Sequence, residues 1–367
     1  MRFATTLQSS LMKAPQKFGK LGRPRVLIVG CGDVGTRCID ALGKRFRIFA
    51  VTRDLQNAAA LRMRGAIPVY ADLDRPASLH RIAALAPWIL HLAPPPTTGA
   101  TDTRTRSLLA ALGRAQAGAR TPLRRSSGTT RCIRPGNTHS ACVPRMAVGR
   151  LRRRMASLCI VPEPGLAPAR ILSYASTSGV YGDCAGALID ETRTTRPANP
   201  RAIRRVDAET ALRDAGVRAL ISLRVIRIPG IYAADRLPLA RLNKGTPALC
   251  PADDVYTSHI HADDLANILC RALWRGMPQR VVHASDDTRL KMGDYFDLVA
   301  RTHGLPLPRR ITREQAGREL EPMLLSFMRE SRRLDNTRLK RELGVRLRYP
   351  SVADFLQEDA WQPTSLT

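Results

Sequence analysis

The segment VLIVGCGDVGTRCIDAL, residues 26–42, constrains the fold of this chain more than any other. It places Gly30, Gly32 and Gly35 in a G-x-G-x-x-G pattern, directly after an apolar run and at the start of a helix-like segment. The first two glycines permit a tight turn and close approach of a pyrophosphate to a helix N-terminus, and the third permits close packing of helix and strand. A second strand-like run follows at residues 47–52, so the segment predicts a dinucleotide-binding βαβ unit.

Seven short apolar runs recur along the chain. They show little alternation of apolar and polar residues, which is typical of strands in a parallel sheet covered on both faces. The spacers between them are long enough for crossover helices. The sequence therefore predicts an α/β protein, a Rossmann-type doubly wound parallel sheet with a smaller C-terminal substrate lobe. The runs lie at residues 25–30, 47–52, 67–73, 88–93, 170–177, 219–230 and 280–285.

The expected domain organisation follows from the spacing of these runs. We expect a Rossmann domain over residues 25–230 and a C-terminal lobe over residues 231–367, with residues 280–285 returning to the sheet. Residues 115–168 are rich in Arg, Ser, Gly, Thr and Pro and predict a disordered basic insertion, and residues 1–24 predict a disordered basic extension. A shifted reading frame in GC-rich DNA would produce a similar composition, so a genuine loop and a gene-model artefact both remain open.

The net charge is strongly positive, with 59 Lys and Arg against 31 Asp and Glu, or +28. A basic total of this size can indicate a nucleic-acid partner. By count, however, 16 of the 28 charges lie in residues 1–25 and 113–169, and 52 of the 59 basic residues are Arg, as GC-rich coding favours. The remainder has no basic helix interleaved with aromatic residues, so we expect no nucleic-acid partner.

Cysteine usage and hydropathy indicate the cellular setting. Eight scattered cysteines fit a reduced, cytoplasmic setting better than a disulfide framework. Cys132, His139 and Cys142 match no common zinc spacing, so no metal is expected. No signal peptide and no run of about 18 apolar residues is present, which predicts a soluble protein without a membrane partner. We expect a small-molecule substrate, and a homodimer is one possible assembly.

The end of the second predicted strand bears on cofactor choice. An NAD-specific site usually offers an acidic side chain here to the ribose 2′-hydroxyl. Thr52 and Arg53 suit a 2′-phosphate better, because a guanidinium can hold it through two hydrogen bonds. The pattern favours NADP, while the neighbouring Asp54 leaves NAD open.

Several further motifs stand in the order found in one superfamily. They are ADLD (71–74), HLAPPP (91–96), ASTSGVYGD (175–183), RIPGIY (227–232), SHIHADDLA (258–266) and the tail at 330–356. With the glycine motif, they make the chain resemble the extended and atypical short-chain dehydrogenases/reductases, the superfamily of NAD-dependent epimerases and dehydratases. The resemblance implies an NADP or NAD cofactor, held by Gly30, Cys31, Gly32, Asp33, Val34, Gly35, Thr52, Arg53, Asp72, Leu73, Leu92, Ala93, Pro94, Arg205 and Pro229.

The catalytic set that the resemblance implies is incomplete. In complete members a Ser or Thr polarises the substrate carbonyl, a Tyr transfers the proton and a Lys holds the nicotinamide ribose. Thr177 occupies the first position, but the stretch NPRAIRRVDAET (199–210) has Arg201 at the Tyr position and Arg205 at the Lys position. Arg205 can keep the cationic role, whereas a guanidinium is a poor proton shuttle. Catalytic roles are therefore implied for Thr177 and Arg205.

Other polar residues near these motifs have structural explanations. As replacement proton donors we consider Tyr181, Asp183, Asp190, Glu191, Tyr232 and Tyr256, and for each we expect packing or capping instead. His261 with Asp264 could suggest a catalytic pair and His91 a base, but we expect structural roles. Lys244 is the candidate phosphate contact in the segment that lies over the sugar nucleotide in relatives.

Two functional hypotheses follow. The first is an NAD(P)-dependent oxidoreductase or epimerase-like enzyme acting on a nucleotide-sugar-like or other polar carbonyl substrate. The alternative is a non-catalytic NAD(P)-binding regulator or assembly factor. Arg201 and Arg205 favour the alternative, and Thr177 with the intact substrate-lobe motifs favours the enzyme.

Overall fold

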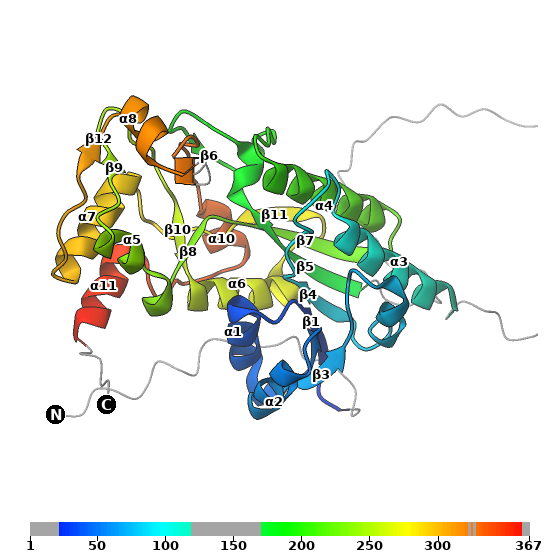
Figure 1. The fold of residues 1–367 in the computed structure, drawn as a ribbon. Coiled ribbons are helices and arrows are strands. Elements are labelled where there is room, and N and C mark those ends of the chain that lie inside the picture. Colours follow the sequence, from blue (N-terminus) through cyan, green and yellow to red (C-terminus); the bar gives the residue numbers. More distant parts are fainter. Residues whose placement is uncertain (1–21, 119–169, 322–323, 326–327, 362–367) are drawn as a thin grey trace, which may run out of the picture.

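The computed structural model describes residues 22–118, 170–321, 324–325 and 328–361. Its centre is a sheet of seven parallel strands in the order β11-β7-β5-β4-β1-β2-β3 (Figure 1). The seven predicted runs form this sheet, so the predicted Rossmann-type fold is confirmed. The strands are β1 (Arg25–Val29), β2 (Arg47–Thr52), β3 (Ile67–Tyr70), β4 (Trp88–His91), β5 (Arg170–Thr177), β7 (Ile221–Ile228) and β11 (Arg280–His283).

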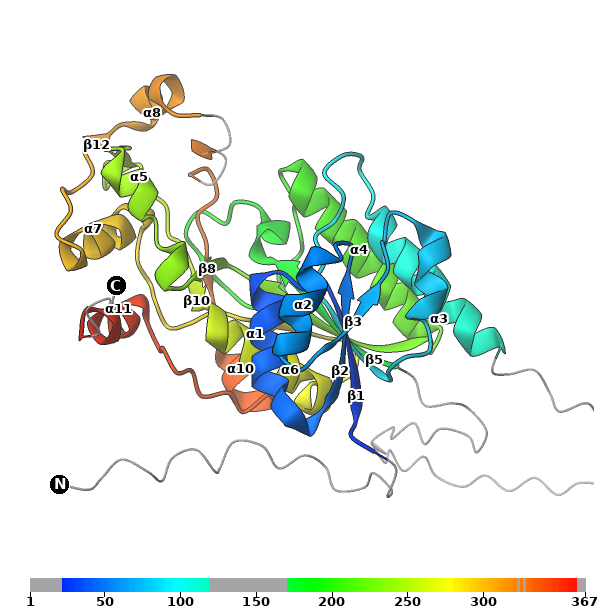
Figure 2. The ribbon, with the colours of Figure 1, turned by 60° about the horizontal axis from the view of Figure 1, so that its bottom comes forward.

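Helices cover both faces of the sheet because successive strand side chains point to opposite sides. In β1, Val26 and Ile28 enter one core while Leu27 and Val29 enter the other. The first core is covered by α1, α2 and α6 and the second by α3 and α4 (Figure 2). These elements are α1 (Asp33–Leu42), η1 (Gly43–Arg45), α2 (Gln56–Met63), η2 (Pro76–Arg81), α3 (Thr103–Gly118), η3 (Ser178–Tyr181), α4 (Pro200–Val217) and α6 (Ala262–Arg275).

A smaller lobe lies beside the sheet (Figure 1). The chain enters it after the carboxyl ends of β7 and β11. Its own core joins Tyr232, Leu242, Phe296 and Phe355. Three short parallel strand pairs lie outside the central sheet: β8 with β10, β9 with β12, and β6 with β13. The last pair joins a segment that follows β5 to the C-terminal part of the chain. The remaining elements are β6 (Leu188–Ile189), β8 (Gly230–Tyr232), η4 (Ala234–Arg236), α5 (Leu239–Asn243), β9 (Ala248–Leu249), β10 (His259–His261), α7 (Met292–Thr302), β12 (Arg310–Ile311), α8 (Arg313–Glu319), β13 (Arg333–Leu334), α10 (Thr337–Glu342) and α11 (Val352–Trp361).

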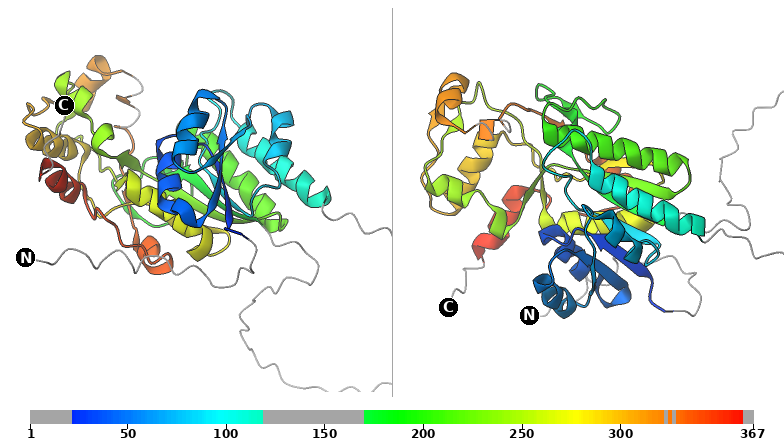
Figure 3. Two further views of the ribbon diagram at one scale, coloured as in Figure 1. Left: turned by 90° about the horizontal axis from the view of Figure 1, so that it is seen from below. Right: turned by 45° about the vertical axis from the view of Figure 1, so that its right-hand side comes forward.

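One predicted boundary is wrong. The insertion was expected to begin at residue 115, but α3 continues to Gly118 and lies alongside α4 (Figure 3). The sequence Ala115-Gln116-Ala117 explains the extension, because alanine and glutamine favour helix. The remainder of the predicted insertion, residues 119–168, lies outside the described residues, as do residues 1–21 of the predicted N-terminal extension.

A buried ion pair fixes α4 to the sheet. Arg227 of β7 donates two hydrogen bonds to Glu209 of α4, at 3.1 and 2.7 Å, and each side chain is only 4 % exposed. The hydroxyl of Ser176 in β5 donates a third hydrogen bond to Glu209 at 2.6 Å. Arg227 also lies over the ring of Tyr181, 4.7 Å from its centre. These contacts hold the N-terminal half of α4, with Arg201 and Arg205, against the carboxyl end of β5.

Candidate dinucleotide site

The glycine motif forms a tight turn between β1 and α1. Gly30 has a φ of 103°, and a Cβ atom added there would lie 2.5 Å from the backbone nitrogen of Ala93. A Cβ on Gly35 would lie 2.5 Å from the carbonyl oxygen of Gly30. Gly32, the N-cap of α1, has open space where a Cβ would stand. The fold itself thus requires glycine at positions 30 and 35, whereas position 32 borders free space at a helix N-terminus.

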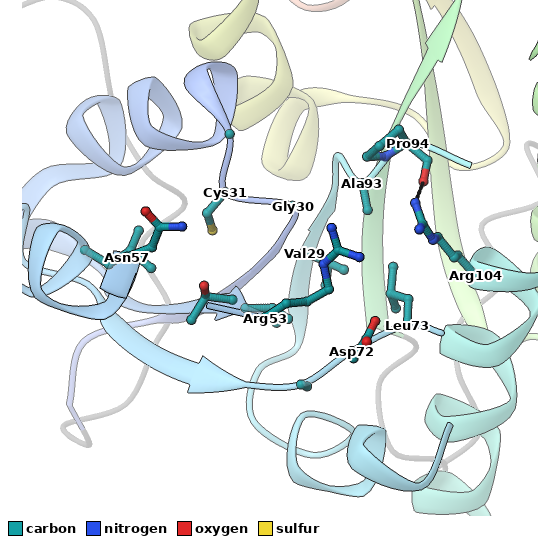
Figure 4. Close-up of a pocket in the computed structure, with 15 residues that line it drawn as sticks. Val29, Gly30, Cys31, Arg53, Asn57, Asp72, Leu73, Ala93, Pro94 and Arg104 are labelled. Carbon is teal, nitrogen blue, oxygen red and sulfur yellow. Dashed lines mark hydrogen bonds between the residues drawn. The ribbon is translucent and has the colours of Figure 1, made fainter. Parts of the chain in front are cut away.

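An open pocket of about 230 Å³ lies over this turn, at the carboxyl ends of β1, β2 and β4 (Figure 4). Its remaining walls include Val29, Val51, Asn57, Leu61 and Ala71. A helix N-terminus whose backbone N–H groups can be approached closely is suited to binding a pyrophosphate. The predicted cofactor residues that line the pocket are Gly30, Cys31, Gly32, Thr52, Arg53, Asp72, Leu73, Ala93 and Pro94.

The other predicted cofactor residues lie outside the pocket lining. Asp33 begins α1 and accepts a hydrogen bond from Arg37 at 2.8 Å, and the Leu92 nitrogen donates to the Val29 carbonyl at 2.8 Å. Val34 packs against the core on the α1 side of the sheet. Gly35 supports the turn from behind, while Arg205 and Pro229 stand at the far end of the sheet edge.

The end of β2 presents a cation rather than an acid to the pocket. Arg53 extends into the pocket (Figure 4), with its side chain 64 % exposed and 3.8 Å from Asp74. The Asp54 carboxylate is engaged elsewhere, because it accepts hydrogen bonds from the Gln56 backbone at 2.8 Å and the Asn57 amide at 3.2 Å. Arg75 lines an adjoining hollow together with Arg53. At the end of β2, the acid is therefore engaged in local hydrogen bonds, and the side chain that lines the pocket there is the guanidinium of Arg53.

Arg104 of α3 is a pocket residue that the sequence did not single out. It forms a bidentate pair with Asp74, at 2.8 and 2.7 Å, and donates to the carbonyl of Pro94 at 3.1 Å (Figure 4). It thereby ties the loop after β3 to the loop after β4. Nothing in the local pattern TDTRTRSLL distinguishes it from the exposed Arg106, so only the tertiary structure reveals this role.

Thr177 lies at the carboxyl end of β5. Its hydroxyl accepts a hydrogen bond from the Gly179 nitrogen at 3.3 Å, and the side chain is half-buried. The turn that follows, η3, packs against the first turn of α4, where a Cβ on Gly179 would lie 4.0 Å from that of Ala202. Thr177 and the start of α4 are therefore neighbours at the same sheet edge.

Arg205 and Arg201 take up different positions on α4. Arg205 is buried, and its Nη1 donates to the Tyr174 hydroxyl at 3.0 Å and to the Ala175 carbonyl at 2.7 Å. Arg201 lies one turn closer to the N-terminus and is exposed. Partial desolvation by surrounding protein atoms, and next the charge of Arg205, lower the pKa of Arg201. Neither side chain offers a proton-transferring group, so the Tyr function is absent from its usual position.

His91 and Tyr174 form part of a buried polar cluster beneath this edge. The Nε2 atom of His91 lies 2.8 Å from the Thr105 hydroxyl, and that hydroxyl donates to Asp102 at 2.8 Å. Burial, and next the charge of Arg205, lower the pKa of His91 to about 3, so the ring is neutral. Burial raises the pKa of Tyr174 to about 12. Both side chains are fully buried, which indicates a structural role.

Most of the considered proton donors are engaged in structural contacts. The Tyr181 hydroxyl lies 2.5 Å from Nε2 of His283, and Glu191 accepts a hydrogen bond from the His283 backbone at 3.0 Å. Asp183 accepts from the Ser331 backbone at 2.7 Å, and Asp190 caps the following turn through the Thr192 nitrogen at 2.9 Å. These contacts account for the four groups closest to Thr177 in sequence.

Tyr256 and Lys244 lie away from the dinucleotide pocket. Tyr256 packs its ring against Arg333, whose guanidinium carbon is 4.7 Å from the ring centre. It lines a separate hollow with Asp253 and Arg313. Lys244 is the exposed C-cap of α5. Among the described residues, neither Tyr256 nor Lys244 therefore contacts Thr177.

His261 and Asp264 organise the start of α6. The Nδ1 atom of His261 accepts a hydrogen bond from the Asp263 nitrogen at 3.2 Å and so caps the helix. Asp264 accepts from the backbone nitrogens of Arg348 and Tyr349, at 2.8 and 2.9 Å. Burial lowers the pKa of His261 to about 4. These contacts join the lobe to the main domain.

A buried acid lies beneath the lobe. Asp286 is 2 % exposed, and one of its oxygens accepts from the Thr288 nitrogen at 3.0 Å. The Tyr232 hydroxyl faces the carboxylate without a hydrogen bond of normal geometry, and the other oxygen of Asp286 has no partner among the described residues. Burial raises the pKa of Asp286 to about 7.

This raised pKa predicts a pH dependence of stability. In the unfolded chain the Asp286 carboxyl titrates near its ordinary value of 3.8. Between that pH and about 7 the native state binds more protons, so the contribution of Asp286 to the free energy of unfolding falls as pH rises, by up to about 1.4 kcal/mol per pH unit. We expect Asp286→Asn to remove this fall. Urea unfolding of the wild type and the variant from pH 4 to pH 8 measures the free energy of unfolding at each pH. Parallel pH profiles for the two proteins would contradict this prediction.

Metal-binding and membrane-spanning features are absent from the described parts of the chain. No three His, Cys, Asp or Glu side chains there stand close enough to hold a metal ion. Cys132, His139 and Cys142 lie outside those parts. None of the helices in the described ranges has the length and apolar character needed to cross a bilayer.

Comparison of whole structures identifies the fold. An uncharacterised conserved protein of Silicibacter pomeroyi superposes with a TM-score of 0.65 and 27 % identity, over 91 % of this chain and 97 % of that one. The UDP-glucose 4-epimerase of Thermotoga maritima, solved with UDP-glucose, gives 0.63 and 15 %, over 92 % and 97 %. The chain has the fold of the extended short-chain dehydrogenases/reductases. The resemblance seen in the sequence is thus confirmed at the level of the fold.

A third structure with this fold carries a nicotinamide cofactor. It is the dTDP-glucose 4,6-dehydratase of Streptomyces venezuelae, solved with NAD bound. It superposes with a TM-score of 0.62 and 17 % identity, over 92 % of this chain and 96 % of that one. No protein-family model matches the chain, and the search of curated protein sequences gives no significant match.

Proposed function

We propose that the chain binds NADP(H) across the carboxyl edge of its sheet. We further propose that it is an oxidoreductase or epimerase-like protein whose second ligand is a polar carbonyl compound. The glycine turn carries the proposal, because positions 30 and 35 are closed to any side chain while position 32 opens onto a pocket at a helix N-terminus. Neighbours with this fold include a dehydratase solved with NAD bound, which supports a nicotinamide cofactor.

The residues around the pocket suggest how the cofactor would lie. Gly32 and the start of α1 would hold the pyrophosphate, and Asp72 with Leu73 would border the adenine. Pro229 and Thr177 stand at the other end of the sheet edge, where the nicotinamide would supply hydride. In this proposal the Thr177 hydroxyl donates a hydrogen bond to the substrate carbonyl.

We expect Arg53→Ala to weaken NADPH binding about tenfold while leaving NADH binding nearly unchanged. The loss corresponds to about 1.4 kcal/mol, the order expected for a hydrogen bond to a charged group. Titration of cofactor fluorescence measures both affinities. Arg318→Ala, at an exposed arginine of α8 paired with Glu314, serves as the control and should bind both cofactors like the wild type. Equal weakening of both cofactors by Arg53→Ala would argue against a 2′-phosphate contact.

A non-catalytic regulator or assembly factor is the second candidate, and a specific observation favours it. Tyr181, Asp183, Asp190 and Glu191 are engaged in hydrogen bonds that hold the fold. Arg201, at the position of the missing Tyr, cannot deliver a proton at neutral pH. In the enzymatic alternative, the oxygen held by Thr177 would take its proton from water.

One experiment separates the two candidates. The purified protein is titrated with NADPH, and the complex is then exposed to a panel of polar carbonyl compounds while cofactor absorbance is followed. Oxidation that disappears in Thr177→Val supports the enzyme. Tight binding with no oxidation across the panel supports the regulator, and absence of binding would overturn the proposed function.

A further inference from the structure

Three arginines lie on the first two turns of α4, at the sheet edge that carries Thr177. The helix begins at Asn199, whose side chain caps the Ala202 nitrogen at 2.9 Å. The helix follows β5 and runs back along the sheet, so its N-terminus stands at the carboxyl end of the strands. Arg201 and Arg205 are one turn apart on this helix and Arg204 lies beside them. Together they place three arginines on the part of α4 that packs against η3, the turn after Thr177.

None of these arginines has an acidic partner among the described residues. Arg204 donates only to the Gly99 carbonyl, at 2.8 Å. Arg205 donates only to the neutral oxygens of Tyr174 and Ala175. The side chain of Arg201 makes no hydrogen bond and no ion pair within the ranges that the structure describes.

Burial makes this lack of partners significant. Arg204 is 6 % exposed and Arg205 7 %, and the Nε atom of each is buried without a hydrogen-bond acceptor. A buried cation without a counter-charge is costly, and an unsatisfied donor adds to that cost. An unsatisfied buried donor in a native protein calls for a specific explanation, and an anion that completes its hydrogen bonds is one.

Other buried arginines of the same domain are satisfied. Arg227, 4 % exposed, is paired with Glu209 through two hydrogen bonds. Arg224, 7 % exposed, lacks an acid, but its Nε donates to the Gly276 carbonyl at 2.9 Å. Within the described part of the main domain, the buried Nε atoms without an acceptor are thus those of Arg204 and Arg205 at the start of α4, while in the lobe the Nε atom of Arg241 shares this property.

We propose that Arg201 and Arg205 bind an oxyanion, a carboxylate or phosphate, of the second ligand beside Thr177. This inference rests on the proposed function, because it assigns a chemical class to the compound that would meet the nicotinamide. A guanidinium presents two parallel donors to such a group. Arg204 is a positioning residue, since it holds the loop after β4 through the Gly99 carbonyl.

The arginines thus change what the site would recognise. A Tyr and a Lys at positions 201 and 205 would present one phenol and one ammonium to a neutral hydroxyl or carbonyl. Two guanidinium groups instead select a substrate with a negative charge close to its reactive carbon, such as a 2-oxo acid or a phosphorylated carbonyl compound. A neutral sugar at that place would leave the charges unpaired.

The test measures anion binding to the protein saturated with NADPH, so that the cofactor's own phosphate sites are filled. Oxalate and inorganic phosphate are the probes, titrated by calorimetry at constant ionic strength in chloride. We expect the wild type to bind at least one of them, and Arg201→Gln to weaken that binding at least fivefold. Stronger binding of oxalate would indicate a carboxylate ligand, and stronger binding of phosphate a phosphorylated one. Arg213→Gln, on the same helix but farther from the edge, is the matched control and should behave like the wild type.

Parallel NADPH titrations keep the outcomes distinct. Normal NADPH affinity in Arg201→Gln with lost anion binding supports the inference. Equal anion binding by wild type and variant, or no binding of either probe, overturns it. Weaker NADPH binding by Arg201→Gln would assign the arginines to the cofactor and also overturn it. Anion binding that depends on Arg201 in a protein that fails to bind NADPH would instead sink the proposed function and leave the arginine site standing.

Discussion

Replacing Gly32 with alanine is expected to weaken NADPH binding at least tenfold while the protein remains folded. A Cβ at position 32 meets no protein atom within 4 Å, so the fold tolerates it. The same methyl group would occupy the space through which a pyrophosphate approaches the start of α1. Fluorescence titration with NADPH and a thermal melt of the same sample measure the two effects separately.

Gly30→Ala is the matched comparison, because it adds the same methyl group two residues earlier. There the Cβ would lie 2.5 Å from the Ala93 nitrogen on a backbone with a φ of 103°. The strained conformation alone costs about 1–3 kcal/mol, and the clash adds to it, so we expect a melting temperature several degrees lower. Unchanged NADPH affinity in Gly32→Ala would refute the placement of the pyrophosphate.

Glu209→Gln is expected to destabilise the protein by about 3–5 kcal/mol, the largest effect of a single side chain that we predict. The glutamine keeps the shape of the side chain but leaves the guanidinium of Arg227 buried without a counter-charge. Because both partners are only 4 % exposed, water cannot screen that charge. Guanidinium chloride unfolding at pH 7 measures the change in the free energy of unfolding.

Glu342→Gln supplies the control for this substitution. Glu342 pairs with Arg280, but their side chains are 23 % and 40 % exposed, so solvent weakens the interaction. Exposed ion pairs contribute at most about 1 kcal/mol. If both variants lost a similar free energy of unfolding, burial would not determine how much the Arg227–Glu209 pair stabilises the protein.

The central sheet could be predicted because each strand carries its own signal. Buried parallel strands are continuous apolar runs, and seven such runs form the sheet. Their ends were less certain: the run predicted at 219–230 contains β7, which ends at Ile228, and the first residue of β8, which pairs with a different partner. The apolar pattern does not mark the point where a chain leaves one sheet for another.

The site was only partly predictable, because several of its contacts join residues far apart in sequence. The glycine turn and Arg53 belong to local motifs and were found at once. Arg104 reaches Asp74 across thirty residues, and Tyr181 reaches His283 across 102. Arg205 was assigned from its spacing alone, which could not show that its Nη1 turns toward Tyr174 and Ala175. Side-chain direction depends on tertiary packing, which spacing along a helix does not report.

The chain departs from α3 after Gly118 and resumes in β5 at Arg170. Arg170 is anchored there by hydrogen bonds to the carbonyls of Leu112 and Ala83, both at 2.9 Å. Both points lie at the amino edge of the sheet, opposite the glycine turn. A reporter such as a fluorescent protein inserted at this junction would be far from the proposed cofactor site. Such a chimera would be a direct way to follow this protein's abundance and location in living cells with the proposed cofactor site left intact.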